Sequence, residues 1–120
     1  MNLIDTDALI EMIKTKKHQP GAISTITLIE TLRGIDTEKR SKIKKLLEES
    51  FTHLNIDNKT IETYCTLYQK LRTNGSLIPD ADMLIASTAI AHNIALQTKD
   101  QHFQRLESLG LILAEKSKNL

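Results

Sequence analysis

Short apolar segments alternate with longer amphipathic segments along the whole chain, and this alternation limits the possible folds more than any other feature. The short segments predict strands at residues 2–5, 22–25, 53–56, 94–98 and 111–114. Between them, helices are predicted at about 7–16, from the second strand to near 34, and at 37–51, 58–73, 79–92 and 102–109. Strands joined through helices favour parallel pairing with helices on both faces. We therefore predict an α/β fold: a three-layer α/β/α domain with a central parallel sheet of about five strands.

Two of these helices carry apolar stripes that we expect to face the core. In the third helix Thr37 is the predicted N-cap, and the stripe is Ile43, Leu46, Leu47 and Phe51. In the fourth, Asp57 or Asn58 is the predicted cap, and the inward residues are Ile61, Tyr64, Cys65, Tyr68 and Leu71. This spacing predicts that Cys65 is a buried small apolar residue rather than a nucleophile.

Composition narrows the class of protein. The chain has 120 residues, 40% hydrophobic and 26% charged, which predicts a single globular domain spanning residues 1–120. Its apolar runs are too short for a membrane span and its N-terminus lacks the basic segment of a signal peptide, so we expect a cytoplasmic protein. One cysteine permits no internal disulfide and no cysteine metal cluster. The histidines lack zinc-site spacing, and we expect surface or turn positions for His18, His53, His92 and His102.

The charges are unevenly distributed although the net charge is only +1. A basic cluster is opposed only by Asp36 and Glu38, and it consists of Arg33, Lys39, Arg40, Lys42, Lys44 and Lys45. This cluster is suited to holding phosphates, and it is equally typical of a solvated helix face. Aromatic residues make up 3% of the chain, which excludes the stacking platform of single-strand binders.

Four acidic residues fall near the predicted carboxyl edge of the sheet. Asp5 ends the first strand, and Asp100 follows the fourth in "LQTKD". Glu30 is the only charged residue between Ile23 and Leu32. In "IPDADMLIAS", Asp80 suits a helix cap, whereas Asp82 shares a face with apolar residues of the same helix. Ligands of parallel sheets bind at this edge, so we expect the four acids to converge there.

Each acid also has a structural interpretation. Asp5, Asp7 and Asp100 are suited to helix caps, and Glu30 can pair with Arg33 three residues later. Glu30 and Asp82 are harder to explain, because a carboxylate on a core-facing stripe needs a partner or a metal ion. Carboxylates gathered together repel unless a cation neutralises them, and oxygen ligands select Mg²⁺ or Mn²⁺. Such a site predicts metal-dependent phosphodiester hydrolysis.

The segments that hold these acids resemble a known family. The segments "LIDTDAL", "ISTITLIETLRGI", "IPDADMLIASTAIAHNIAL" and "QTKDQHFQRL" are similar, in this order, to those of PIN-domain ribonucleases, and in particular to the VapC toxins of toxin–antitoxin systems. The resemblance spans Asn2 to about Leu113. It implies that the catalytic and metal-binding acids are Asp5, Glu30, Asp82 and Asp100. The supporting polar residues that it implies are Thr6, Ser24 and Thr98, with an additional acid at Asp7 where many relatives carry Asn.

The resemblance also implies an activity and partners. It implies a Mg²⁺- or Mn²⁺-dependent endoribonuclease that cleaves tRNA or ribosomal RNA, leaving a 5′-phosphate and a 3′-hydroxyl. It further implies a homodimer that a VapB-type antitoxin neutralises by lying across the acidic groove. Our hypothesis is that the basic cluster, from Arg33 to Lys45, forms part of the rim that holds RNA.

Three alternatives remain open from the sequence. A catalytically inactive PIN-like binding module would keep the four acids without cleavage. A phosphoacceptor receiver domain would use Asp57 with Thr98 and Lys99, and it would leave Glu30 and Asp82 unexplained. A DNA-directed nuclease is also conceivable, although no extra elements for gripping a flap are visible.

Overall fold

The computed structural model describes residues 1–114, and its strands form one parallel sheet in the order β3-β2-β1-β4. The strands are β1 (Leu3–Ile4), β2 (Ala22–Ser24), β3 (Thr52–Leu54) and β4 (Leu96–Gln97). Beyond β4, Leu113 adds a single parallel bridge to Leu96. The predicted α/β class and parallel sheet are confirmed. The predicted fifth strand is reduced to this bridge among the described residues.

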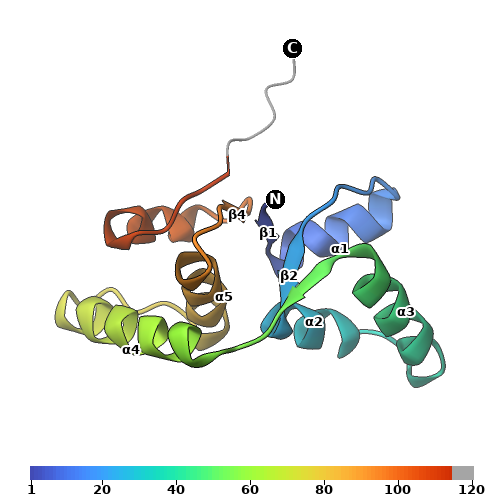
Figure 1. Ribbon diagram of the computed structural model, residues 1–120, viewed down its shortest axis with the longest axis horizontal. Coiled ribbons are helices and arrows are strands. Elements are labelled where there is room, and N and C mark those ends of the chain that lie inside the picture. The colour runs from blue at the N-terminus through green and yellow to red at the C-terminus, as the bar shows by residue number, and fades with distance from the viewer. Residues whose placement is uncertain (115–120) are drawn as a thin grey trace, which may run out of the picture.

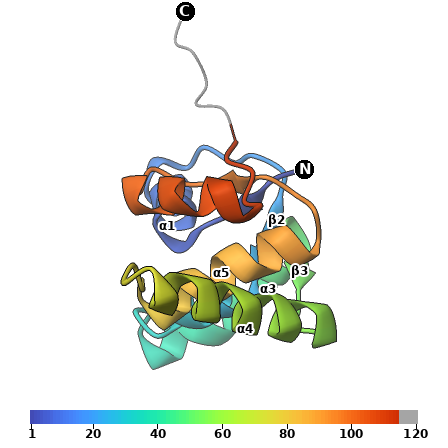
Figure 2. The ribbon, with the colours of Figure 1, turned by 90° about the vertical axis from the view of Figure 1, so that its left-hand side faces the viewer.

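Helices cover both faces of the sheet (Figure 1). They are α1 (Thr6–Thr15), α2 (Thr25–Leu32), α3 (Thr37–Ser50), α4 (Asn58–Thr73), α5 (Asp80–Ala91) and the 3₁₀ helix η1 (Gln101–Leu109). Figure 2 shows η1, α5 and α4 stacked on one face. No helix within residues 1–114 is both long enough and apolar enough to cross a membrane.

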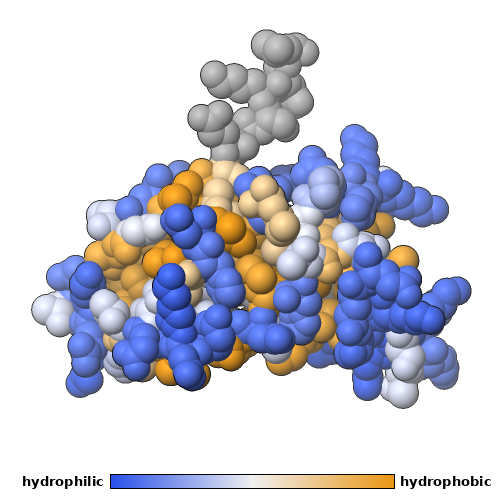
Figure 3. Space-filling view, in the orientation of Figure 1, coloured by the Kyte–Doolittle hydropathy of each residue, from blue (hydrophilic) through white to orange (hydrophobic). Residues whose placement is uncertain are grey.

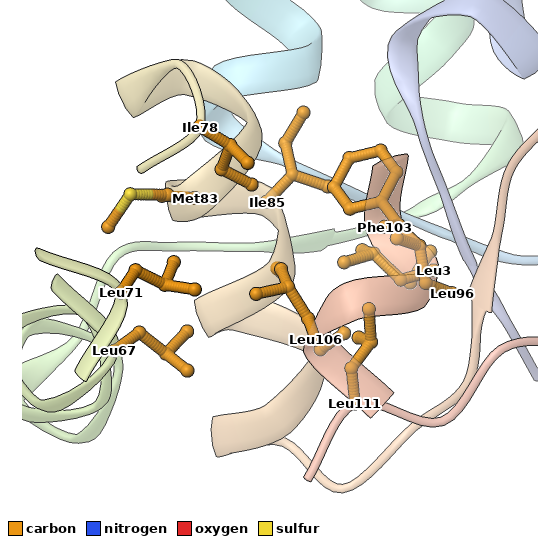
Figure 4. Packing of buried hydrophobic residues seen from close by; sticks show 13 residues of the cluster. Leu3, Leu67, Leu71, Ile78, Met83, Ile85, Leu96, Phe103, Leu106 and Leu111 are labelled. Carbon is orange, nitrogen blue, oxygen red and sulfur yellow. The ribbon is translucent and has the colours of Figure 1, made fainter. Parts of the chain in front are cut away.

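The two faces of the sheet bury two separate apolar clusters, because neighbouring residues of a strand point to opposite sides. Leu3 and Ala22 face the cluster built with α4, α5 and η1, whereas Ile4 and Ile23 face the cluster built with α1, α2 and α3. Figure 4 shows the first cluster, in which side chains from the sheet, α4, α5 and η1 meet. The short strands are therefore fixed in register by apolar contacts on both sides.

The buried stripe of α4 differs from the predicted one. Thr60, Leu67 and Leu71 are buried, whereas Ile61 and Cys65 are exposed. Thr60 can be buried because its hydroxyl donates to the Asp57 carboxylate at 2.8 Å. The inward face therefore starts one residue earlier than the apolar pattern indicates, and the predicted burial of Cys65 is wrong.

Helix α3 differs from the prediction at one position of its stripe, because Leu46 is 56% exposed. Leu47 and Phe51 face the core as predicted. Thr37 is the first helical residue rather than the N-cap, and Asp36 precedes it without a side-chain capping bond. Asp57, in contrast, caps α4 as predicted by accepting the backbone N–H of Thr60 at 2.9 Å. The bonds from the backbone N–H and the hydroxyl of Thr60 lower the pKa of Asp57.

The start of α5 also differs in detail. Asp80 is its first residue, follows Pro79, and makes no capping bond there. Its carboxylate instead accepts the phenolic O–H of Tyr64 at 2.7 Å, and this bond raises the pKa of Tyr64 to about 12. Asp80 thus has a structural role, as predicted, but it links α4 to α5 instead of capping the helix.

We predict that Gly21→Ala destabilises the protein by about 1–3 kcal/mol, because the added methyl group has no room. A Cβ atom there would lie 2.7 Å from Ile4 Cδ1 and 3.0 Å from the Asn2 carbonyl oxygen, which belongs to the backbone beside β1. Gly34→Ala is the matched control, since its nearest neighbour would be the Thr31 carbonyl oxygen at 3.7 Å. Chemical denaturation of both variants measures the difference. Equal stability of the two would contradict the assignment.

Candidate active site

Asp5 leaves the carboxyl end of β1 and begins α1. It is 4% exposed, and its Oδ1 accepts the backbone N–H of Ala8 at 2.9 Å. Burial raises the pKa of Asp5, while hydrogen bonds from Thr98 and Ala8 act in the opposite direction. The backbone N–H of Asp5 also donates to the carbonyl of Gln97 at 3.1 Å. This pairing brings the end of β1 beside the end of β4.

Glu30 lies on α2, whose start is fixed by Ser24. Ser24 accepts the backbone N–H of Thr27 at 3.1 Å and is therefore the N-cap. The Thr6 hydroxyl donates to Glu30 Oε1 at 2.7 Å. It lies 3.2 Å from the Thr27 hydroxyl, which in turn lies 3.4 Å from that of Ser24. Each hydroxyl has one proton to donate. Ser24 therefore donates to Thr27, Thr27 donates to Thr6, and Thr6 donates to Glu30. Thr6 thus contacts an acid directly, and Ser24 acts through the helix start.

Asp82 lies in the first turn of α5 and faces His102. Its Oδ2 lies 3.0 Å from His102 Nε2. Burial raises the pKa of Asp82 most, the carboxylates of Asp100 and Glu30 add to this, and His102 acts in the opposite direction. Asp82 is therefore a partly buried carboxylate in a negative environment.

Asp100 follows β4 and is the N-cap of η1. Its Oδ1 accepts the backbone N–H of His102 at 3.1 Å and lies 2.7 Å from His102 Nδ1. Its own backbone N–H donates to the Thr98 hydroxyl oxygen at 3.0 Å. Thr98 therefore contacts both Asp5 and Asp100. The predicted capping role of Asp100 and its place at the sheet edge are compatible.

The four acids line one pocket of about 270 Å³. Its walls include Ile10, Ile85 and Phe103. Its polar lining consists of Asp5, Thr6, Asp7, Glu30, Arg33, Asp82 and Asp100. The structure thus brings together the four predicted acids, Thr6 and Asp7, and places Ser24 and Thr98 behind them as hydrogen-bond partners. Their catalytic roles remain predictions.

The predicted basic cluster divides into two parts. Arg33 lines the pocket, and its Nη2 lies 3.7 Å from Glu30 Oε2 while its side chain is 72% exposed. The remaining cations lie on α3 outside the pocket lining, where Figure 3 shows strongly hydrophilic side chains at the right of the molecule. They are Lys39, Arg40, Lys42, Lys44 and Lys45, of which Lys44 pairs with Glu48 at 2.7 Å.

The sequence prediction missed His102. It was expected at the surface or in a turn, yet its ring contacts two of the four acids. A signal was present in "KDQHF", because a residue two positions after a helix cap lies within reach of the capping carboxylate. The position of the histidine between Asp100 and the core residue Phe103 therefore pointed toward the site.

The donor chemistry of the pocket fits a hard divalent cation. Oxygen donors converge from four separate segments. Burial raises the pKa of Asp82 most, and the nearby carboxylates of Asp100 and Glu30 raise it further. Within residues 1–114, no three acidic, histidine or cysteine side chains are already close enough to enclose an ion. Arg33 instead contacts Glu30, and His102 contacts Asp82 and Asp100. Binding of an ion therefore requires these side chains to adjust around it.

Comparison with known proteins shows which family the chain belongs to. The PIN domain family model matches residues 3–109. The chain is 38% identical over 118 residues to ribonuclease VapC1 of Methanocaldococcus jannaschii, covering 95% of this chain and 87% of the relative. It is 30% identical to ribonuclease VapC4 of Mycobacterium tuberculosis, covering 75% of this chain and 74% of the relative.

Solved structures show the same fold. VapBC2 from Rickettsia felis, bound to a DNA fragment from its promoter, gives a TM-score of 0.81 at 25% identity, covering 97% of this chain and 98% of that chain. DNA-bound VapBC from Salmonella typhimurium gives a TM-score of 0.82 at 21% identity, covering 95% of this chain and 98% of that chain. Together with the matched family model, these relatives show that the chain belongs to the PIN domain family and, within it, to the VapC group.

Proposed function

We propose that the protein is a Mg²⁺- or Mn²⁺-dependent endoribonuclease that acts as a VapC-type toxin. The observation that carries this proposal is the convergence of four carboxylates from four separate segments on one pocket. The names of the relatives support ribonuclease activity. The oxygen-rich donor set supports metal dependence, because it matches the ligands that Mg²⁺ and Mn²⁺ prefer.

In this proposal Asp5, Glu30, Asp82 and Asp100 hold the metal ion. When bound, the ion supplies a water of lowered pKa and neutralises charge on the phosphodiester. The chain's other residues set the positions of these acids. Thr6 fixes one oxygen of Glu30, and the backbone N–H of Ala8 fixes one oxygen of Asp5. The other oxygen of Glu30, Oε2, lies 3.7 Å from Arg33 Nη2, so a metal ion bound there would compete with Arg33.

Arg33 and the α3 cations suit a polyanionic substrate. Arg33 lies at the pocket with a largely exposed side chain, where a substrate phosphate can compete with Glu30 for its guanidinium group. The α3 cations offer a second positive surface on the same molecule. We propose that the substrate is tRNA or ribosomal RNA, that cleavage leaves a 5′-phosphate and a 3′-hydroxyl, and that the protein works in the cytoplasm.

We further propose that the protein is a homodimer inhibited by a VapB-type antitoxin. The support for an antitoxin partner comes from similar structures described as VapBC complexes. The chemistry of the pocket suits this mode of inhibition, because a basic side chain from a partner would find several carboxylates there. Such a side chain would occupy the place of the metal ion and stop cleavage.

One prediction of this proposal concerns Asp82, the acid that sequence and structure single out most clearly. Asp82→Asn lowers RNA cleavage by at least ~100-fold while the protein stays folded, because the substitution removes a metal-ligand charge and keeps the side-chain shape. The measurement incubates antitoxin-free protein with total RNA and either Mg²⁺ or Mn²⁺. A reaction with EDTA, which removes the metal ion, is expected to show no cleavage. Sequencing of the fragment ends identifies the target and the 5′-phosphate.

Asp80→Asn is the matched control, because it removes a carboxylate two residues away on the same helix. The hydrogen bond that Tyr64 donates weakens, because its acceptor becomes a neutral amide oxygen, so the melting temperature falls while cleavage is kept. A stable but inactive Asp80→Asn variant would reverse the roles of the two acids. Intact RNA with folded wild-type protein under both metals would favour an inactive binding module.

Another prediction tests the α3 surface. Charge reversal of Lys42, Lys44 and Lys45 to Glu weakens RNA binding and lowers the salt slope by about 2, because phosphate contacts release fewer counterions. Binding is measured across a salt series in the Asp82→Asn background, which prevents cleavage. The control is the same triple reversal at Lys59, Lys70 and Arg72 on α4. Equal losses in both variants would remove α3 as the RNA rim.

A further inference from the structure

The charge of the pocket opposes the substrate proposed above. Its lining within residues 1–114 includes five carboxylates and the guanidinium group of Arg33. RNA is a polyanion, so this lining repels its backbone unless cations lie along the path by which the strand crosses the pocket. Cations at the rim of the pocket are therefore candidates for holding the strand.

Lys99 lies at the rim on the side of β4. It stands between Thr98, whose hydroxyl accepts the backbone N–H of Asp100, and Asp100 itself, which lines the pocket. Its ammonium group contacts the Glu11 carboxylate on α1. Glu11 directly follows Ile10, which also lines the pocket. Both partners of this ion pair are therefore neighbours in sequence of residues that form the site.

Arg33 and Lys99 reach the pocket from opposite flanks. In the sheet order β3-β2-β1-β4, β1 lies between β2 and β4. Asp5 follows β1, Arg33 follows β2 through α2, and Lys99 follows β4. An RNA strand that lies across the pocket therefore meets a cation on each side of the acids, and contacts of this kind to phosphates position a nucleic acid.

The ion pair between Lys99 and Glu11 is open to exchange. The two side chains are 71% and 49% exposed. Exposed ion pairs contribute little to stability, because water and salt screen them. A phosphate of a bound strand offers the lysine another anionic partner, and its flexible stem allows the ammonium group to turn toward that phosphate. Glu11 is then the partner of Lys99 only in the absence of substrate.

We propose that Lys99 is a substrate-binding residue that holds a backbone phosphate of RNA at the β4 flank of the pocket, and that Glu11 competes with this phosphate for the ammonium group. This inference rests on the RNA substrate proposed above. Removal of either side chain breaks the same ion pair, so a merely structural pair predicts the same effect for both. The proposal instead predicts opposite effects on RNA affinity.

The test measures binding of labelled single-stranded RNA of random sequence, with Mg²⁺ and across a salt series, in the Asp82→Asn background. Lys99→Ala is expected to weaken binding about 3- to 10-fold and to lower the salt slope by about 0.7, as for one phosphate contact to a single strand. Glu11→Gln is expected to tighten binding about 2- to 5-fold, because no ion pair has to break first.

Two controls and a double variant separate this contact from a general effect of charge. Lys59→Ala and Glu62→Gln make the same charge changes at exposed positions of α4, and each is expected to change the affinity by less than about 2-fold. When Glu11→Gln is added to Lys99→Ala, no gain in affinity is expected, because no ammonium group is released.

Cleavage assays with Asp82 intact complete the test. Lys99→Ala is expected to raise KM for RNA and to leave kcat unchanged, because the lysine contributes to binding and not to the metal site.

The outcomes separate this inference from the function on which it rests. Shifts of the same sign in Lys99→Ala and Glu11→Gln, or a Glu11→Gln gain that persists in the double variant, overturn the phosphate contact and leave the proposed nuclease intact. Equal shifts in the α4 controls also overturn it. Folded wild-type protein that neither binds nor cleaves RNA overturns both the contact and the proposed function.

Discussion

Parallel pairing of β1 with β4 is the constraint on which the rest of the structure depends. Leu3 pairs with Leu96, Ile4 pairs with Gln97, and the backbone of Asp5 continues the ladder to Gln97. Because the two strands run in the same direction, both end at one edge and deliver Asp5 and Asp100 there. Helices α2 and α5 then supply Glu30 and Asp82 to the same edge. The backbone thus brings all four acids to one edge of the sheet.

Helix starts make this concentration of negative charge tolerable. Asp5 and Asp100 are N-caps, and Asp82 lies in the first turn of α5, so three of the four carboxylates lie near backbone N–H groups and the positive end of a helix. Glu30 is the exception, and its stabilisation comes from Thr6 and Arg33. His102 contacts both Asp82 and Asp100. Structural capping and a potential metal-binding role are therefore combined in the same side chains.

The sequence was sufficient to predict the parallel α/β fold and the convergence of the acids, because both follow from where apolar segments end. It was insufficient where burial depended on local hydrogen bonds. Thr60 is buried through its bonds to Asp57, which turns α4 and exposes Cys65. The predicted lengths of the last two strands were also too long, since β4 pairs over two residues and Leu113 forms a single bridge. His102 was missed because its two partners are brought to it by different elements. The receiver-domain alternative is wrong, since the chain belongs to the PIN domain family and Asp57 caps α4.

The order of the acids along the chain has a consequence for biosynthesis. Asp5 and Glu30 leave the ribosome early, whereas Asp82, Asp100 and His102 belong to the last third of the sequence. Because β1 pairs with β4, the pocket forms only after residues 96–102 have emerged and folded back against the N-terminal strand. A nascent chain therefore holds only part of the acid cluster until this pairing has formed.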